Sequence, residues 1–181
     1  MKKQNTALYI LRLSLTLLAI TAVVAAALAL VNSLTASRIA QITEEKTQAA
    51  IDEVLPGGGE KLEINTTGIV QAVYASEKGY AVQVAPSGFD GEILMMVGID
   101  KEGNVMGIDI ISHTVTAGLG AVAAADNAKG EYFRNQFGGQ GGTLAVDKDG
   151  GTIEALTSAT ITSRAVVTGV NAALECVKNL G

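Results

Sequence analysis

The longest pattern in the chain is an apolar stretch near its N-terminus. No charged residue lies between Leu13 and Val31, and Ala7–Leu11 extends the stretch on the other side of Arg12. About 20 consecutive apolar residues are enough for a helix to cross a bilayer, so we predict a transmembrane helix here. A cleaved signal peptide is the alternative, since Ala25–Ala29 offers small residues for cleavage. It fits less well, because a signal core has about 7–15 apolar residues.

The charges beside this stretch predict its orientation. Lys2, Lys3 and Arg12 precede it, and no acidic residue does. The side rich in lysine and arginine remains in the cytoplasm. We therefore predict a single-pass protein of the cell membrane, with a cytoplasmic N-terminus and with everything after Asn32 on the extracytoplasmic side.

A helical pattern continues after the apolar stretch, from Ser33 to Leu55. Apolar residues recur there at roughly helical spacing among charged ones, and the run Pro56–Gly59 ends the pattern. We interpret this segment as a helical stalk. The predicted organisation is residues 1–32 for the N-terminus and transmembrane helix, 33–59 for the stalk and glycine-rich linker, and 60–181 for an extracytoplasmic domain.

The pattern after residue 60 changes to short strands. The sequence predicts them at residues 61–64, 69–75, 79–84, 92–99 and 105–112. Asp100–Asn104 joins the last two as a hairpin turn, in which Gly103 can adopt a positive φ. Residues 93–99 (I-L-M-M-V-G-I) alternate poorly, which favours a strand buried on both faces.

The remainder predicts helices and one more hairpin. We predict a helix at 121–129, an aromatic segment at 131–137 packed on the core, and a hairpin of 144–146 with 152–156. A final helix, 164–180, directs apolar residues to the core: Val166, Val170, Ala173, Leu174 and Val177. The fold class is therefore α+β: a transmembrane helix and helical stalk, then an antiparallel sheet with packed helices.

Composition limits the chemistry. The single Cys176 and single His113 exclude an intrachain disulfide and any multi-cysteine or multi-histidine metal cluster. From Arg38 onward ten basic residues stand against all 18 acidic ones, which makes nucleic acid a poor partner. Redox chemistry would have to come from a cofactor. We assign no catalytic residue and no metal ligand.

The richest candidate site is Leu156–Val166, L-T-S-A-T-I-T-S-R-A-V. Five hydroxyls lie in it directly before a helical pattern: Thr157, Ser158, Thr160, Thr162 and Ser163. Hydroxyls and free N–H groups at a helix start can bind phosphate. A serine or threonine N-cap for the last helix is the plainer interpretation, and it is common.

A second candidate is His113–Gly120, H-T-V-T-A-G-L-G, which follows the last predicted strand. Its glycines would let the backbone approach a planar ligand or a phosphate. A plain strand-to-helix turn explains the same residues, and a lone histidine is more often structural than catalytic.

Four motifs together carry a family resemblance. They are G-Y-x-V-x-V from Gly79, G-I-D-K-E-G-N-V-M-G-I from Gly98, H-T-x-T-x-G-L-G from His113 and T-S-A-T-I-T-S-R-A-V-V from Thr157. With the N-terminal anchor and stalk, they resemble the FMN-binding G subunits of the Rnf ion-translocating ferredoxin:NAD oxidoreductases. The C subunits of the sodium-translocating NADH:quinone reductases share this domain.

The resemblance implies a covalent flavin. In the family the motif reads S/T-G-A-T, and its last threonine, Thr160 here, forms a phosphoester with FMN. The resemblance also implies that neighbouring residues line the flavin: Thr157, Ser158, Ala159, Ile161, Thr162, Ser163, Thr114, Thr116, Gly118, Leu119 and Gly120. We expect Thr162 and Ser163 to bind phosphate or cap the helix. The chain departs from the pattern at Ser158 (glycine in the family), Glu154 (aspartate) and Val115–Gly120.

The implied function is electron relay in a membrane complex that couples electron flow between ferredoxin and NAD to sodium or proton movement. Implied partners are the other membrane, iron–sulfur and flavin subunits and a flavin transferase. Two alternatives remain open. One is the corresponding quinone-reductase component or a stand-alone extracytoplasmic electron carrier, and the other is an adaptor without flavin.

Overall fold

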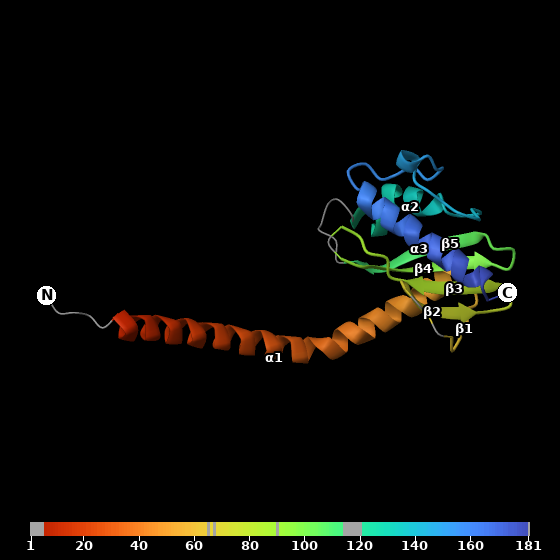
Figure 1. The fold of residues 1–181 in the computed structure, drawn as a ribbon. Coiled ribbons are helices and arrows are strands. Elements are labelled where there is room, and N and C mark those ends of the chain that lie inside the picture. The colour runs from red at the N-terminus through yellow and green to blue at the C-terminus, as the bar shows by residue number, and fades with distance from the viewer. Residues whose placement is uncertain (1–5, 65, 67, 90, 114–120, 181) are drawn as a thin grey trace. The chain divides into compact units, whose positions relative to one another are not determined.

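The computed structural model describes residues 6–64, 66, 68–89, 91–113 and 121–180. The chain divides into two compact units, residues 1–42 and residues 43–181. The elements in chain order are α1 (Thr6–Val54), β1 (Glu60–Lys61), β2 (Val70–Ala75), β3 (Gly79–Val84), β4 (Ile93–Asp100), β5 (Val105–His113), η1 (Ala121–Ala124), α2 (Ala128–Asn135), η2 (Asp147–Asp149) and α3 (Thr160–Lys178) (Figure 1).

The first unit is the N-terminal part of α1. Its large apolar side chains between residues 13 and 31 are all exposed. The hydroxyls of Thr16 and Thr21 donate to the carbonyl oxygens of Arg12 (2.8 Å) and Leu17 (3.0 Å) in the same helix, so neither needs an outside partner. The helix predicted here is therefore present, and by length and composition it can cross a membrane.

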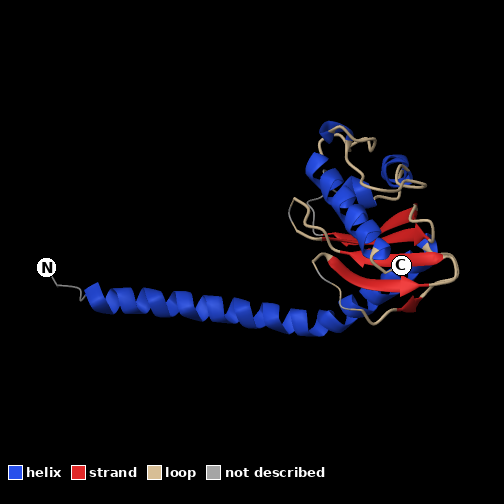
Figure 2. Ribbon diagram, turned by 45° about the vertical axis from the view of Figure 1, so that its right-hand side comes forward, coloured by secondary structure: helices blue, strands red, loops and turns tan. Residues whose placement is uncertain are grey.

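The second unit is built on one antiparallel sheet, drawn in red in Figure 2. Its strand order is β1-β2-β3-β4-β5. Four of the five predicted strands are present, whereas the first, predicted at 61–64, is reduced to Glu60–Lys61. The predicted β4–β5 turn is also confirmed. Its Gly103 has φ 84°, and the Asp100 carboxylate accepts the backbone N–H of Asn104 at 2.7 Å.

β4 is buried on both faces, as its poor alternation predicted. Met95 packs with the apolar face of α3, whereas Met96 packs with Ile51 and Leu55 from the C-terminal end of α1 and the residue after it. Both methionines are 0% exposed. The sheet is thus covered by α3 on one side and by the end of α1 on the other, so the last part of the predicted stalk belongs to the unit that begins at Thr43.

Glycine permits the close approach of α1 to the sheet. A Cβ added to Gly98 of β4 would collide with the backbone carbonyl oxygen of Val54, the last residue of α1. On the other face, a Cβ at Gly169 of α3 would lie 3.0 Å from Pro86 and 3.1 Å from the Met95 sulfur. The two helices therefore lie so close to the sheet that side chains at these positions would separate the layers.

The prediction of one helix over residues 121–129 is wrong. The chain forms the short 3₁₀ helix η1, turns, and begins α2 at Ala128. Asn127 causes the break, because its side-chain oxygen accepts the N–H groups of Lys129 (3.1 Å) and Gly130 (3.0 Å) and so caps a new helix. The aromatic segment does pack on the core, as predicted: Phe133 and Phe137 are fully buried with ring centroids 5.5 Å apart.

The prediction of a hairpin from residues 144–146 and 152–156 is also wrong. Val146 and Ile153 form a single parallel bridge, and the 3₁₀ turn η2 with Gly150 (φ 84°) lies between them. A side chain at Gly151 would collide with the carbonyl oxygen of Ala145, so the chain crosses itself closely at this point. Without a hairpin partner, the segment after Ile153 depends on other groups for its backbone hydrogen bonds.

Substitution of Gly98 tests the packing of α1 on the sheet. We expect Gly98→Ala to lower the free energy of unfolding by about 1–3 kcal/mol, since the added methyl overpacks the contact with Val54. Chemical denaturation of the full chain in detergent measures this. Gly107→Ala is the matched control, because Gly107 pairs with Gly98 across the sheet but has no atom within 4 Å of an added Cβ. Equal effects of the two substitutions would contradict the close approach.

Candidate functional site

The candidate motif forms a tight turn followed directly by α3. The N–H of Ala159 donates to the carbonyl oxygen of Leu156 at 2.9 Å, which closes the turn around Thr157 and Ser158. Thr160 is the first helical residue and is half-buried, and Ile161 is 50% exposed. The helix therefore begins four residues earlier than predicted, inside the motif.

Ser158 has a backbone conformation that favours glycine. Its φ is 65°, and no other non-glycine residue in the described part of the chain has a positive φ. A turn with a positive φ only at its third residue usually has glycine or asparagine there. Ser158 occupies that position, so the structure gives a physical reason for the glycine of the family pattern. Serine can adopt this conformation, at a cost of about 1–2 kcal/mol.

The start of α3 has no side-chain cap. The N-cap position is Ala159, whose side chain accepts no hydrogen bond. The prediction that Thr162 or Ser163 caps the helix is therefore wrong, since both lie inside it and are buried, at 3% and 0% exposure. The first N–H groups of a helix have no partner within it, and no described side chain caps those of α3, so they can serve as donors to an anion.

The Ser163 hydroxyl has a different role. It donates to the carbonyl oxygen of Ala159 at 3.1 Å and accepts the N–H of Leu156 at 3.0 Å. Both bonds hold the turn that precedes Thr160. Because the proton of this hydroxyl is already donated, a phosphate contact from Ser163 would break a bond within the turn.

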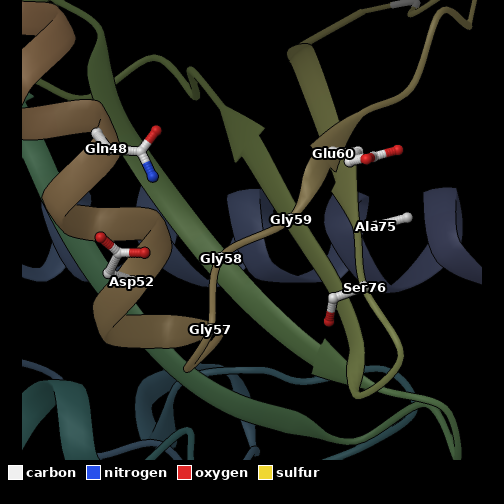
Figure 3. Close-up of a pocket in the computed structure, with 8 residues that line it drawn as sticks. All are labelled: Gln48, Asp52, Gly57, Gly58, Gly59, Glu60, Ala75 and Ser76. Carbon is white, nitrogen blue, oxygen red and sulfur yellow. The ribbon is translucent and has the colours of Figure 1, made fainter.

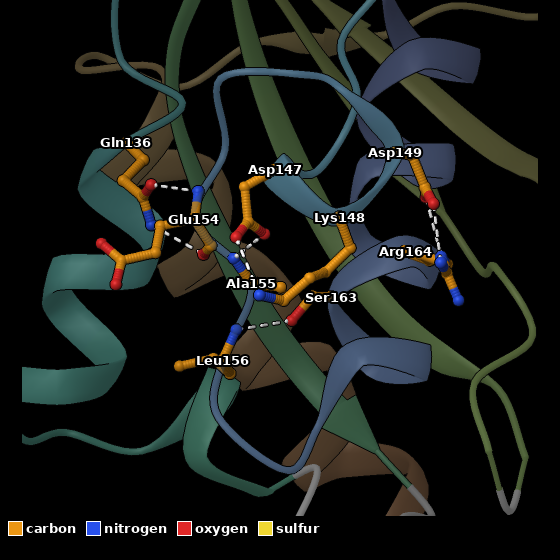
Figure 4. A network of polar contacts seen from close by, with 9 residues as sticks. All are labelled: Gln136, Asp147, Lys148, Asp149, Glu154, Ala155, Leu156, Ser163 and Arg164. Atoms are coloured by element: carbon orange, nitrogen blue, oxygen red, sulfur yellow. Dashed lines mark hydrogen bonds and ion pairs between the residues drawn. The ribbon is translucent and has the colours of Figure 1, made fainter.

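Two further side chains hold the segment that leads into the turn (Figure 4). Asp147 in η2 accepts the N–H of Ala155 at 3.0 Å. Gln136, just after α2, accepts the N–H of Glu154 at 2.7 Å and donates to its carbonyl oxygen at 3.3 Å. With Ser163, three consecutive backbone amides are therefore bound by side chains from three different parts of the fold.

An ion pair fastens the same loop to α3. Arg164 donates to both carboxylate oxygens of Asp149, at 2.6 and 2.7 Å (Figure 4). This pairing lowers the pKa of the Asp149 carboxyl, chiefly through the hydrogen bond from Arg164. The pKa of the Asp147 carboxyl is lowered chiefly by the hydrogen bond from the Ala155 amide. Both carboxyls thus hold their partners best when ionised.

The second predicted segment lies largely outside the described residues. Thr114, Thr116, Gly118, Leu119 and Gly120 are among the undescribed ones, so their contribution stays a prediction. His113, which precedes them, ends β5. Its Nδ1 is buried and has no hydrogen-bond partner among the residues that the structure describes. An unpartnered buried nitrogen beside the predicted flavin segment is consistent with a polar ligand there, because buried polar groups are normally paired.

A pocket of about 600 Å³ lies elsewhere, between the end of α1 and the edge of the sheet (Figure 3). Gln48, Asp52, the Gly57–Gly59 loop and Glu60 line it. Its polar, acidic lining does not suit a flavin phosphate, and it contains no residue of the candidate motif. The surface at the start of α3, where the motif lies, remains the candidate site.

Comparison with known families gives matches over most of the chain. Residues 1–54 match the RnfG N-terminal region and residues 88–175 match the FMN-binding domain. The second match includes β4, β5, the turn at Ser158 and most of α3. The chain therefore combines an apolar N-terminal helix, long enough to cross a membrane, with an FMN-binding domain.

Individual relatives identify the family. The chain is 32% identical to the G subunit of the Na⁺-translocating ferredoxin:NAD⁺ oxidoreductase complex of Acetobacterium woodii, over 94% of this chain and 93% of the relative. It is 36% identical to the G subunit of the ion-translocating oxidoreductase complex of Yersinia pestis, over 81% and 80%. It is 38% identical to the G subunit of the proton-translocating ferredoxin:NAD⁺ oxidoreductase complex of Clostridium ljungdahlii, over 58% of each chain. The chain belongs to the family formed by the G subunits of these complexes, as its motifs predicted.

Sequence patterns gave no signal for the side chains that hold the motif in place. Gln136 lies in an aromatic segment that we interpreted only as core packing, and Asp147 and Asp149 lie in what looked like a hairpin turn. The partners of Gln136 and Asp149 are distant in the chain: 18 residues separate Gln136 from Glu154, and 15 separate Asp149 from Arg164. Only the fold brings them together.

The strain at Ser158 gives a stability prediction. We expect Ser158→Gly to raise the free energy of unfolding, by up to about 1 kcal/mol, because glycine adopts a positive φ without steric cost. Chemical denaturation measures the change. Thr157→Gly is the control, since Thr157 has no positive φ and glycine there should destabilise the fold by about 0.5–1 kcal/mol. If Ser158→Gly lowered the free energy of unfolding, the claim that the conformation of Ser158 is strained would be contradicted.

Protonation of Asp147 and Asp149 in acid should weaken the hydrogen bonds that hold their loop and so lower the stability of the fold. A carboxyl whose pKa is lowered by folding stabilises the fold above its unfolded pKa, about 3.9, and loses that contribution as the pH falls through the folded value. We expect the temperature of the thermal unfolding midpoint to decrease as the pH is lowered below about 4. The double variant Asp147→Asn/Asp149→Asn should be less stable at neutral pH, and its midpoint should fall less in acid. If the unfolding temperature of the double variant decreased in acid as steeply as that of the unchanged protein, the two carboxyls would not make this contribution to stability.

Proposed function

We propose that this chain is a membrane-anchored electron-transfer subunit that carries FMN covalently on Thr160 and relays electrons within an Rnf-type complex. The observation that supports this most directly is the geometry at the start of α3. The T-S-A-T sequence forms a turn with a positive φ at Ser158 and places Thr160 first in an uncapped helix.

The residues at this site fit a flavin phosphodiester. Thr160 supplies a hydroxyl that can be esterified, and the free N–H groups of the first helical turn supply donors for the remaining charge. The positive end of the helix dipole favours the same anion. Ile161 beside Thr160 is 50% exposed and offers an apolar surface to the flavin ring.

Attachment is a phosphoryl-group transfer made by a flavin transferase. The oxygen of the Thr160 hydroxyl forms a bond to the phosphorus of an FMN donor whose phosphate carries a leaving group, such as a flavin dinucleotide. The bond from phosphorus to the leaving group breaks, and the leaving group departs with the electron pair. The hydroxyl proton passes to a base of the transferase. No group is oxidised or reduced in this step.

The covalent bond suits the proposed location. Lys2, Lys3 and Arg12 favour a cytoplasmic N-terminus, which supports an extracytoplasmic position of the FMN domain. A cofactor that dissociates there would be lost by dilution, and an ester to the chain prevents this. Bound flavin supplies one- and two-electron redox chemistry. The names of the relatives support assembly with the other subunits of an ion-translocating oxidoreductase complex.

Substitution of Thr160 tests the attachment site. We expect Thr160→Ala, made together with its transferase, to show no flavin fluorescence on a denaturing gel and no added FMN mass, because the acceptor hydroxyl is missing. Thr168→Ala is the matched control: Thr168 lies on the same helix, and its hydroxyl bonds the carbonyl oxygen of Arg164 at 2.9 Å. Flavin retained in full by Thr160→Ala would refute the site. A colourless unchanged protein would favour the adaptor alternative.

A further inference from the structure

We propose that Gln136, Asp147 and Ser163 are positioning residues that hold the segment before the motif and so present Thr160 for flavin attachment. This inference rests on the proposed function, because it takes Thr160 as the attachment residue. None of the three side chains is proposed to touch the flavin. They act through the backbone amides of Glu154, Ala155 and Leu156.

The first step is that the sheet does not hold this segment. Its only regular pairing in the described structure is the single bridge of Val146 with Ile153. The last backbone bonds of that bridge are from Ile153 N–H to Ala145 (3.2 Å) and from Asp147 N–H to Ile153 (2.7 Å). From Glu154 on, a strand partner is replaced by three side-chain acceptors at 2.7, 3.0 and 3.0 Å.

The second step is that these acceptors are themselves fixed. Gln136 directly precedes the fully buried Phe137, and it binds both the N–H and the carbonyl of Glu154, as a neighbouring strand would. Ser163 is fully buried in α3. Asp147 lies in η2, which Asp149 ties to α3 through Arg164.

The third step links Gln136, Asp147 and Ser163, which together form the clamp, to Thr160. Ser163 and Arg164 belong to the same helix that Thr160 begins, so the segment is held in the frame of the attachment residue. Only the turn of residues 157–159 separates the clamped amides from Thr160. That turn contains the unfavourable φ of Ser158. A residue in such a conformation keeps it only when its surroundings fix it on both sides, and the clamp fixes the N-terminal side.

The test compares substitutions of Asp147, the most accessible member of the clamp. We expect Asp147→Ala to slow the initial rate of flavin attachment by the transferase, with a flavin dinucleotide as donor, about tenfold, because the acceptor hydroxyl is misplaced. Asp147→Asn keeps a side-chain oxygen for the Ala155 amide and should restore the rate. Glu102→Ala, in the exposed β4–β5 turn, is the surface control.

A second measurement does not depend on flavin. Hydrogen exchange of the flavin-free full chain in detergent should show faster exchange at the Ala155 amide in Asp147→Ala than in Asp147→Asn, with the β4 amides unchanged in both. If Asp147→Ala does not fold, Gln136→Leu takes its place, with exchange read at Glu154.

The outcomes separate the clamp from the attachment site. An unchanged attachment rate and unchanged exchange at Ala155 in Asp147→Ala would overturn the clamp, as would an equal loss of rate in Asp147→Asn, since charge would then be the cause. Thr160→Ala is assayed in parallel. If it still takes up flavin, the proposed function fails, whatever the clamp variants do.

Discussion

The two-sided burial of β4 is the constraint on which the rest of the second unit depends. Met95 and Met96 are neighbours in sequence, but they bury against different helices on opposite faces of the sheet. The contact of Gly98 with the backbone of Val54 fixes the α1 side, and Gly169 allows α3 an equally close approach on the other. The last turn of α1 is therefore part of the domain core. The sheet lies between this turn and α3, the helix that begins at Thr160, and packs against both.

The turn before α3 contains a residue with an unfavourable backbone conformation, and hydrogen bonds hold the chain around it. Ser158 has a positive φ without being glycine, and the chain on both sides of it is held. Ser163 binds Ala159 after it and Leu156 before it, and side chains from the end of α2 and from η2 bind the two residues that precede Leu156. Strained conformations of this kind persist only where the surrounding structure determines them. The departure of Ser158 from the family pattern is therefore compatible with the turn that the pattern implies.

Much of this fold could be predicted from the sequence, because it depends on local patterns. The apolar run, the strand alternation and the turn at Gly103 indicated the membrane helix, the meander and its hairpin, and the motif indicated the family. The errors came where one side chain overrides a pattern. Asn127 caps a second helix inside an alanine-rich run, and the loop around Gly151 replaces a hairpin with one parallel bridge. The groups that position the motif depend on contacts between distant residues, which periodicity does not reveal.

The charges around Thr160 bear on the proposed covalent attachment of the flavin. Arg164 is four residues after Thr160 and so lies on the same side of α3. Its guanidinium, however, is bound to Asp149 by two short hydrogen bonds and adds little net positive charge. The domain as a whole is acidic, so among the described residues the N–H groups and the dipole of the first turn of α3 are the groups left to neutralise a phosphate. A helix terminus of this kind contributes about 0.3–1 kcal/mol toward an exposed anion, so by itself it would hold a phosphate only weakly. The proposed ester to Thr160 would supply the missing retention, and the helix start would then have only to orient the phosphodiester.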